Sequence, residues 1–542
     1  MIIALAQLNY HIGNFEQNVE KIIAKINEAK SQKVDLVVFS ELAVCGYPPL
    51  DFLEFPHFIN QCELAIQNIA KHCQNIAAIV GSPSINASLD GKNLYNSAYF
   101  LVDGKVESVH HKALLPNYDI FDEYRYFESS KTFDIIQYKG KKIALTICED
   151  LWDIEDDKMY RIWPMEELKK TSPDLMINIA ASPFSNIQIE ERNKVLSWNA
   201  KNYGFPLFYV NQAGAQTEII FDGGSKVINS NGETIGELQY FEEDFQIFDT
   251  ENLPQPISKF DYEKYFFVEK ALIKGIRDYF DKMNFHKAIL GLSGGIDSAL
   301  VLYLAVKALG KENVHAVLMP SQFSSEHSIT DSLALVENLG NTHQILPIKN
   351  IFDAYVDELA ETFEGTSFNI AEENLQSRSR GVLLMAISNK FGQILLNTSN
   401  KSELAVGYGT LYGDMCGGLS VIGDLYKTEV FELCRYINRE KEIIPENIIT
   451  KAPSAELRPN QKDSDSLPEY DVLDEILKLY IEERKSPKQL IDLGFNEQLV
   501  NRVLKLVNTN EYKRKQFAPI LRVSKKAFGM GRRMPIVGKY LS

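Results

Sequence analysis

The stretch from Lys287 to Leu300, KAILGLSGGIDSAL, constrains the fold of this chain more than any other feature. It begins with apolar residues, continues as a short run of glycine and serine, and returns to apolar residues at helical spacing. This order predicts a buried strand, a tight loop and the start of a helix. In such a loop, backbone N–H groups and the positive end of a helix point at whatever group is bound in front of it, and this arrangement favours a phosphate.

The glycine loop differs from the two commoner phosphate-binding loops. It lacks the Gly-Lys-Ser/Thr of a Walker A loop, and its glycines do not follow the spacing G-x-G-x-x-G. The hydroxyls of Ser293 and Ser298 and several N–H groups could hold a phosphate, and the Asp297 carboxylate could hold Mg²⁺. The six residues from Ser293 to Ser298 (SGGIDS) are, by themselves, also compatible with a strand-to-helix turn in which glycine only permits positive φ.

The second half of the chain continues with strands and helices in alternation. Val314–Met319 and the QILPI segment are typical of strands, and TDSLALVENLG between them is typical of a helix. This pattern predicts an α/β domain with a Rossmann-like, doubly wound and mainly parallel sheet. Ligands of such sheets bind at the carboxyl ends of the strands, which is where the glycine loop lies.

The first half, to about Asp249, mixes helices, strands and hairpins. An amphipathic helix is predicted to begin at Phe15 with Asn14 as its N-cap, followed by a buried strand at Val34–Ser40. Asp-Gly, Lys-Gly and Asn-Gly pairs at residues 103, 139 and 231 indicate hairpins. This mixture predicts layers of sheet covered by helices. Further strands are predicted at Ile143–Ile147, Leu175–Ile179 and Leu207–Val210.

A chain of 542 residues implies more than one domain. The stretch FEEDFQIFDTENLPQPIS combines charge, two prolines and little periodicity, so we expect a linker from about Thr250 to Phe260. A helix at about Tyr262–Met283 then leads into the second domain. The predicted divisions are residues 1–249, a linker and connecting helix at 250–285, and residues 286–542.

Charge and composition favour a soluble, cytoplasmic protein. The formal net charge of −16 is unfavourable for nucleic-acid binding, and no segment has the apolar length needed to cross a membrane. The start, MIIALAQLNYHIGN, lacks the basic region of a signal peptide. The last residues, from Ala518, carry basic but no acidic side chains, so this end is either a solvated tail or a place for an anionic substrate.

The cysteines indicate neither a disulfide framework nor a zinc site, because they are scattered without a C-x-x-C pair. One of them, Cys148, ends the predicted strand of IALTICEDLW, while Glu41 and Lys112 also directly follow apolar runs. A thiolate, a carboxylate and a lysine suit attack on an amide, as nucleophile, general base and oxyanion stabiliser. Taken singly, Cys148 could be a buried apolar residue, Glu41 a helix cap and Lys112 a surface charge.

The residues around these three resemble the nitrilase superfamily, and within it the glutamine amidotransferases. The matching stretches are SELAVCGYPPLD, HHKALLPNYDIFDEYRYF and ICEDLW. The resemblance implies an α-β-β-α sandwich in which Glu41, Lys112 and Cys148 are catalytic. It also implies that Tyr118 and Ser182 bind glutamine. Gln188 occupies a third glutamine-binding position, where lysine is common in the family.

The second half resembles the NAD synthetase family within the ATP pyrophosphatases. The similarity extends from SGGIDS through MPSQFSSEHS, ENLQSRSRG, NTSNKSELAVGYGTLYGD, KAPSAELRPNQKDSDSLPEYDVLD and RVSKKAFG. It implies that deamido-NAD binds at Asn374, Glu403 and Arg522, the last replacing an expected lysine. It implies Mg²⁺ on Asp297 and Glu403, with Lys401 assisting. The ATP-binding residues it implies are Gly291, Leu292, Ser293, Gly294, Gly295, Ile296, Asp297, Ser298 and Thr398.

Together the two resemblances imply two linked reactions. Cys148 would release ammonia from glutamine, and the second domain would activate the deamido-NAD carboxylate with ATP and convert it to an amide. Because free ammonia is protonated in neutral water, a shielded path between the sites is expected. The families also imply self-association into a homo-oligomer.

Two other functions compete with this interpretation. A tRNA-modifying or purine-aminating ATP pyrophosphatase would share the glycine loop, but it would want a basic surface or a different amidotransferase domain. A binding or sensing protein could keep the fold without turnover, although Glu41, Lys112, Cys148 and the SGGIDS loop are all intact.

Overall fold

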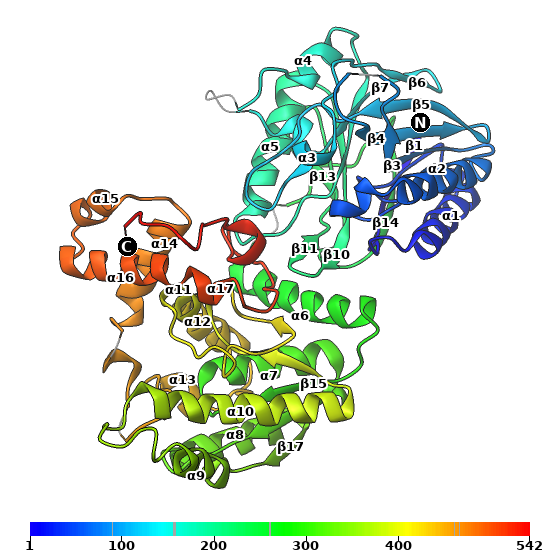
Figure 1. Ribbon diagram of the computed structural model, residues 1–542. Coiled ribbons are helices and arrows are strands. Elements are labelled where there is room, and N and C mark those ends of the chain that lie inside the picture. Colours follow the sequence, from blue (N-terminus) through cyan, green and yellow to red (C-terminus); the bar gives the residue numbers. More distant parts are fainter. Residues whose placement is uncertain (89, 155–158, 259–261, 460, 466, 542) are drawn as a thin grey trace. The chain divides into compact units, whose positions relative to one another are not determined.

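The computed structural model describes residues 1–88, 90–154, 159–258, 262–459, 461–465 and 467–541. Contacts between Cα atoms divide the chain into two compact units, Met1–Tyr262 (unit 1) and Glu263–Ser542 (unit 2). The division falls inside the predicted connecting segment, and the helix of that segment, α6 (Lys264–Lys282), belongs to unit 2. Figure 1 shows that each unit contains its own sheets and helices.

Unit 1 contains two six-stranded sheets and a separate hairpin. The first sheet consists, in spatial order, of β14 (Asp244–Asp249), β1 (Ile2–Gln7), β2 (Leu36–Val38), β3 (Ala77–Ile85), β4 (Leu94–Val102) and β5 (Lys105–His111). The second consists of β13 (Thr234–Glu237), β12 (Lys226–Ile228), β9 (Leu207–Asn211), β8 (Leu175–Ala180), β7 (Lys141–Ile147) and β6 (Ile136–Tyr138). The hairpin pairs β10 (Ala213–Gln216) with β11 (Ile219–Asp222).

Five helices and two 3₁₀ turns complete the described part of unit 1. They are α1 (Phe15–Ser31), η1 (Leu50–Glu54), α2 (Pro56–Lys71), α3 (Glu123–Tyr126), η2 (Cys148–Leu151), α4 (Pro164–Lys169) and α5 (Gln188–Tyr203).

Side chains that alternate along β1 show how the layers of unit 1 pack. Ile3 and Leu5 lie in one apolar core together with Ile177 of β8 in the other sheet, whereas Ala4 and Ala6 lie in a second core with α1 and α2. Successive side chains of a strand point to opposite faces, so β1 contributes to both cores. The predicted α-β-β-α sandwich is confirmed, with α1 and α2 outside one sheet and α5 outside the other (Figure 1).

Unit 2 is built on a five-stranded sheet in which all neighbouring strands are parallel. Its strands are, in spatial order, β17 (Thr342–Ile345), β16 (Val314–Leu318), β15 (Ala288–Gly291), β18 (Ile394–Asn397) and β19 (Leu419–Ser420). The chain builds outward from β15 in one direction and then from β18 in the other, which confirms the predicted doubly wound fold. The point between β15 and β18 is where ligands bind in such sheets.

Helices surround this sheet and continue beyond it. After α6 they are α7 (Ile296–Leu309), α8 (Glu326–Leu339), α9 (Lys349–Glu358), α10 (Ile370–Phe391), α11 (Lys401–Val406), α12 (Lys427–Ile437), α13 (Glu446–Thr450), α14 (Tyr470–Ile481), α15 (Pro487–Asp492), α16 (Glu497–Thr509) and α17 (Glu511–Arg514). Three 3₁₀ turns accompany them, η3 (Lys311–Asn313), η4 (Asp463–Asp465) and η5 (Gly529–Gly531).

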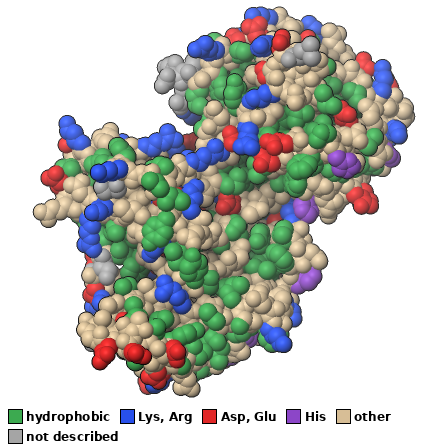
Figure 2. All heavy atoms as spheres, viewed as in Figure 1, with side chains coloured by type: hydrophobic (Ala, Val, Ile, Leu, Met, Phe, Trp, Pro, Cys, Tyr) green, Lys and Arg blue, Asp and Glu red, His purple; other side chains and the backbone are tan. Residues whose placement is uncertain are grey.

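The surface carries charged side chains of both signs, with hydrophobic side chains between them on the face seen in Figure 2. Val382 and Met385 of α10, one turn apart, are 57% and 38% exposed. Among the residues that the structure describes, no helix combines the length and the hydropathy needed to cross a membrane.

The predicted hairpins are confirmed, because β4 pairs with β5, β6 with β7 and β12 with β13 around the three glycine turns. The predicted strand at Val34–Ser40 is shorter, since only Leu36–Val38 pairs with its neighbours as β2. Val34 and Asp35 precede this strand, Phe39 and Ser40 follow it, and a turn of residues 41–45 begins at Glu41. Asn14 is the N-cap of α1, as predicted, and its side chain accepts a hydrogen bond of 3.2 Å from the Gln17 N–H.

Loss of this cap should weaken unit 1. We expect Asn14→Ala to lower the free energy of unfolding of unit 1 by about 1 kcal/mol, because one N–H at the start of α1 loses its partner. All three tryptophans (Trp152, Trp163 and Trp198) lie in unit 1, so tryptophan fluorescence in a urea titration reports on this unit. The matched control is Asn496→Ala, which removes the N-cap of α16 in unit 2. An equal shift of the fluorescence transition in both variants would contradict the prediction.

Candidate active sites

The buried amine of Lys112 organises the predicted site of unit 1. Its Nζ donates to Glu41 Oε1 at 2.8 Å and to Glu123 Oε1 at 2.9 Å, and all three side chains are buried. Burial alone lowers the pKa of Lys112, but the Glu123 and Glu41 carboxylates outweigh it and hold this pKa well above its usual value. Lys112 is therefore a fixed positive charge that is shielded from water and paired with two carboxylates, which is compatible with the predicted role of an oxyanion stabiliser.

Glu123 is a residue of this site that the sequence interpretation missed. Burial raises its pKa to about 7 and the nearby Glu41 adds to the effect, while Lys112 and the Tyr47 hydroxyl oppose it. Tyr47 donates to Glu123 Oε1 at 2.8 Å. Glu123 lies on the four-residue helix α3, in a stretch with several acidic residues, so no spacing signal separates it from its neighbours.

Cys148 follows β7 directly and has a left-handed backbone, with φ of 43°. This conformation is uncommon for a residue with a side chain, and strain of this kind is frequent at functional sites. Burial, reinforced by the Glu41 carboxylate, raises the pKa of the Cys148 thiol well above its usual value, and Lys112 opposes the shift. Burial and the Glu41 carboxylate thus both favour the neutral thiol over the thiolate.

A single carboxylate joins the segment after Lys112 to the turn at Cys148. Asp150 Oδ1 accepts hydrogen bonds from the N–H groups of Ala113 and Leu114 at 3.0 and 2.9 Å, and its Oδ2 accepts one from Ile147 N–H at 3.0 Å. The segments that carry Lys112 and Cys148 are consequently held together by one buried side chain. The sequence interpretation did not identify this role, because it depends on contacts between distant segments.

Two of the predicted glutamine-binding residues lie in segments that contact Glu41 or Glu149, the residue after Cys148. The Tyr118 hydroxyl donates to Glu149 Oε1 at 2.9 Å, next to Cys148 in the chain. The N–H of Ala181, which precedes Ser182, donates to Glu41 Oε2 at 2.9 Å. Gln188 lies further along the chain as the first residue of α5, and its N–H donates to Ser185 O at 3.0 Å.

The glycine loop of unit 2 lines a cavity of about 290 Å³. The loop connects β15 to α7, and its Gly294 has φ of +81°. A Cβ at Gly294 would lie 2.4 Å from the Ser328 carbonyl oxygen, so only glycine fits there. Every residue that the sequence interpretation assigned to ATP lines this cavity, and so does Glu403.

Lys427 pairs with both carboxylates that were predicted to hold Mg²⁺. Its Nζ donates to Asp297 Oδ2 and lies 3.7 Å from Glu403 Oε1. Burial and the neighbouring Asp297 raise the pKa of Glu403 to about 8, against the opposing charge of Lys427. Lys427 opens α12, far from the glycine loop in sequence, and the sequence interpretation missed it.

The expected assisting lysine lies elsewhere. Lys401 is fully buried, and its Nζ bonds Glu482 Oε1 and Ser524 Oγ, each at 2.7 Å, and lies 3.0 Å from Asp424 Oδ1. Among the described residues, Lys427 lines the cavity and Lys401 does not.

The two predicted deamido-NAD residues Asn374 and Arg522 are not in the described lining of the cavity. Asn374 accepts a hydrogen bond of 2.7 Å from Thr410 Oγ1, while Arg522 is buried and donates to Lys525 O at 3.4 Å.

Comparison with known proteins agrees with the division of the chain into two units. A family model for carbon-nitrogen hydrolases matches residues 2–251, and one for NAD synthases matches residues 268–517. A glutamine-dependent NAD(+) synthetase of Synechocystis is 48% identical over 98% of this chain and 98% of the relative. The chain belongs to the glutamine-dependent NAD(+) synthetase family.

Solved structures of this family have the same fold over the whole chain. The synthetase of Acinetobacter baumannii, solved with adenosine diphosphate, is 40% identical, covers 99% of this chain and 98% of its own, and has a TM-score of 0.79. A synthetase from Cytophaga hutchinsonii is only 21% identical but has a TM-score of 0.84 over 99% of this chain and 98% of its own. The two-unit architecture is therefore that of the family.

Gly81 tests how closely the fold holds Glu41. A Cβ on this β3 residue would lie 2.4 Å from Leu42 N and 2.5 Å from Ser40 O, on either side of Glu41. We expect Gly81→Ala to displace this turn and to lower NAD(+) formation from glutamine at least about tenfold, since small misplacements of catalytic groups are costly. NAD(+) formation from ammonium should be retained.

The control for this experiment is Gly140→Ala, in the turn between β6 and β7, where an added Cβ meets nothing within 4 Å. Because Gly140 has φ of +76°, this variant shows what backbone strain away from Glu41 does to the activity. Unchanged glutamine-dependent activity in Gly81→Ala would show that the turn tolerates the added carbon.

Proposed function

We propose that this chain makes NAD(+) by amidating deamido-NAD, using ATP for activation and glutamine as the nitrogen source. The observation that carries the proposal is that one chain contains both a buried Glu41–Lys112–Cys148 group and a glycine-loop cavity with Asp297 and Glu403. The first arrangement suits amide hydrolysis through a thioester, and the second suits transfer of an adenylyl group. Neither reaction by itself would require the other unit.

In unit 1, Glu41 takes the proton from the Cys148 thiol while the sulfur attacks the side-chain amide carbon of glutamine. The oxygen of the tetrahedral intermediate carries negative charge, which the fixed cation of Lys112 stabilises. Glu41 then gives the proton to the leaving nitrogen, and ammonia departs from a glutamyl thioester. Water, deprotonated by Glu41, hydrolyses the thioester, so that glutamate is released and the thiol is restored.

Glutamine is held beside Cys148 by Tyr118 and Ser182 in this proposal, with Gln188 as a third contact. Tyr118 and the segment before Ser182 both bond to residues at the reacting group, namely Glu149 and Glu41. These short connections support their assignment.

In unit 2, the nicotinate carboxylate of deamido-NAD attacks the α-phosphate of ATP and pyrophosphate leaves. The loop from Gly291 to Ser298, which includes the N-terminus of α7, lines the cavity together with Thr398, and its N–H groups would hold the phosphates. Ammonia then attacks the acyl carbon of the adenylate, AMP leaves, and the amide of NAD(+) is formed. Asn374, Glu403 and Arg522 are the proposed contacts of deamido-NAD.

Mg²⁺ is part of the proposal, and the Asp297 and Glu403 carboxylates would hold it. Among the described residues no group of three His, Cys, Asp or Glu side chains could hold a metal ion by itself. Mg²⁺, however, commonly binds through one or two carboxylates together with phosphate oxygens, and both carboxylates line the same cavity. The ion would supply positive charge to the pyrophosphate leaving group.

We also infer that the enzyme acts in the cytoplasm as a homo-oligomer, without nucleic-acid or membrane partners. The exposed Val382 and Met385 on α10 support self-association, because a second copy would cover apolar surface that otherwise faces water.

Replacing the nucleophile should separate the two reactions. We expect Cys148→Ala to form NAD(+) from ammonium at the wild-type rate and not from glutamine, because only the glutamine reaction uses the thiol. Mass spectrometry of NAD(+), AMP and glutamate measures both. Cys73→Ala, a buried cysteine whose Sγ bonds only Ile69 O in its own helix region, is the control. Glutamine-dependent NAD(+) formation by Cys148→Ala would contradict the role of the thiol.

Replacing Asp297, in the cavity of unit 2, should lower NAD(+) formation with either nitrogen donor. We expect Asp297→Asn to lower NAD(+) formation from glutamine and from ammonium at least about 100-fold, since a charge facing the phosphates is lost. EDTA should stop NAD(+) formation in the wild type, and Mg²⁺ should restore it. Asp353→Asn, on the exposed face of α9, is the matched control. Full activity in EDTA would rule out the proposed metal.

A further inference from the structure

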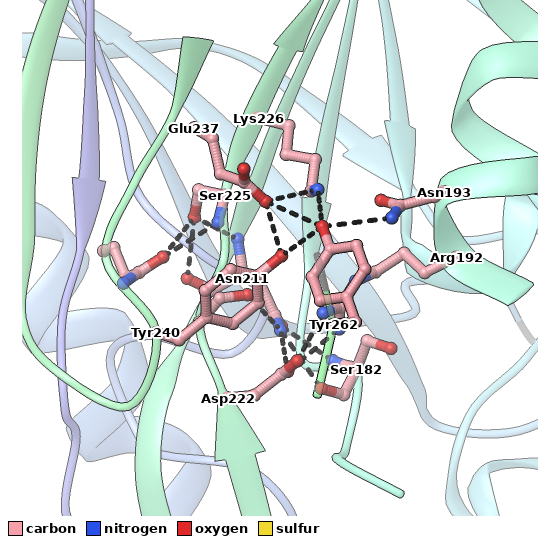
Figure 3. Close-up of polar contacts among 12 residues, drawn as sticks. Ser182, Arg192, Asn193, Asn211, Asp222, Ser225, Lys226, Glu237, Tyr240 and Tyr262 are labelled. Atoms are coloured by element: carbon pink, nitrogen blue, oxygen red, sulfur yellow. Dashed lines mark hydrogen bonds and ion pairs between the residues drawn. The ribbon is translucent and has the colours of Figure 1, made fainter. Parts of the chain in front are cut away.

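The hydroxyl of Tyr262 is the meeting point of a polar network that the proposed reaction does not use (Figure 3). It accepts hydrogen bonds from Lys226 Nζ at 3.0 Å and from Asn193 Nδ2 at 3.2 Å, and it donates to Glu237 Oε1 at 3.1 Å. The Tyr240 hydroxyl lies 3.0 Å away. One phenol thus links α5, β12, β13 and the segment after β13.

The charges in this network explain why the hydroxyl matters. Lys226 is 2% exposed, and its Nζ bonds Glu237 Oε1 at 2.5 Å. Taking an ion pair out of water is offset only when further hydrogen bonds stabilise it. The hydroxyls of Tyr240 and Tyr262 supply two of these, both to Glu237 Oε1, at 2.5 and 3.1 Å. Removing the Tyr262 hydroxyl would remove one of the hydrogen bonds that stabilise the Lys226–Glu237 ion pair.

A second set of contacts extends from the same region to Ser182, a proposed glutamine-binding residue. The Ser182 N–H donates to Asn211 Oδ1 at 2.8 Å, and Asn211 Nδ2 donates back to Ser182 O at 3.1 Å. Asn211 Nδ2 also lies 3.4 Å from Asp222 Oδ1, and Asp222 forms a fully buried two-point ion pair with Arg192. Ser182 is consequently anchored through its backbone to β9, β11 and α5.

The two sets share their backbone supports. Arg192 of the second set and Asn193 of the first are consecutive residues in the early turns of α5. Ser225 and Lys226 are consecutive at the start of β12, and Ser225 Oγ accepts a 3.0 Å hydrogen bond from Asn211 N–H. If α5 or β12 shifted after loss of the Tyr262 contacts, Arg192 or Ser225 would shift with it. Because both are linked to Asn211, which bonds the Ser182 backbone, Ser182 would also move.

We propose that Tyr262 is a positioning residue for glutamine binding, which acts by holding α5 and β12 so that Ser182 stays in place beside Glu41. Ser182 follows Ala181, whose N–H is bonded to Glu41 Oε2 at 2.9 Å. The proposal rests on the proposed glutaminase function of unit 1. Tyr262 itself contacts neither the nucleophile nor the cation in any hydrogen bond described above.

Positioning predicts an effect on KM and not on kcat. Besides the Ala181 N–H, Glu41 is held by Asn96, whose Nδ2 donates to Glu41 Oε1 at 2.7 Å. Glu123 and Asp150 hold Lys112 and the turn at Cys148, and none of Asn96, Glu123 and Asp150 belongs to the Tyr262 network. A small shift of Ser182 should therefore weaken glutamine binding while these contacts keep the reacting groups in place. A merely structural role for Tyr262 would instead lower the amount of folded enzyme, which reduces kcat and leaves KM unchanged.

The test is Tyr262→Phe, with glutamate release and NAD(+) formation measured against glutamine concentration. We expect KM for glutamine to rise about threefold to tenfold, the effect of about one hydrogen bond, with kcat within twofold of the wild type. NAD(+) formation from ammonium should not change. Tyr203→Phe is the matched control, because Tyr203 lies at the other end of α5 and its hydroxyl donates to Glu166 Oε1 at 3.0 Å.

Asn193→Ala provides an independent variant, since it removes a Tyr262 contact and keeps the phenol. We expect it to raise KM for glutamine as well, and the double variant to have no larger effect than the stronger single one. An unchanged KM in both single variants, or a fall in kcat with KM constant, would overturn the inference. Wild-type enzyme that releases no glutamate from glutamine would contradict the proposed function instead.

Discussion

Burying the charge of Lys112 is the constraint on which the first unit depends. A cation without solvent is tolerated only when carboxylates and other polar groups surround it, and Glu41 and Glu123 meet that need at 2.8 and 2.9 Å. The same arrangement suits the role proposed for Lys112, because a fixed positive charge shielded from water stabilises a developing oxyanion without reorganisation. Asp150 connects the segment after Lys112 to the turn at Cys148, since it accepts hydrogen bonds from the N–H groups of Ala113 and Ile147.

The second unit has a different constraint, because it places two carboxylates in one cavity. The parallel sheet brings the ends of β15 and β18 together, so the glycine loop and Thr398 face one cavity. Asp297 and Glu403 also face it, and their repulsion is relieved by Lys427. The raised pKa of Glu403 reflects the remaining cost of placing two carboxylates side by side under burial.

The Tyr262 network shows that buried polar groups of this protein also act away from the reacting atoms. Its ion pair and hydroxyls join the last residue of unit 1 to the strands and the helix that support Ser182. The chain continues from Tyr262 directly towards α6 of unit 2. Positioning of a binding residue through paired, buried contacts is a way to control affinity without changing the catalytic group itself.

The sequence by itself predicted sheet layers covered by helices in the first half, a doubly wound sheet in the second and the glycine loop, because periodicity, turn residues and short motifs are local signals. It predicted Cys148, Lys112 and Glu41 as well as the loop residues around Asp297 from their own neighbours. Only the tertiary structure identified Glu123, Asp150, Lys427 and the Tyr262 network, and only it moved Lys401 from the cavity into a buried cluster. The physical reason is that a charged side chain acquires its role from partners distant in sequence, and those partners become neighbours only when the sheets and helices pack.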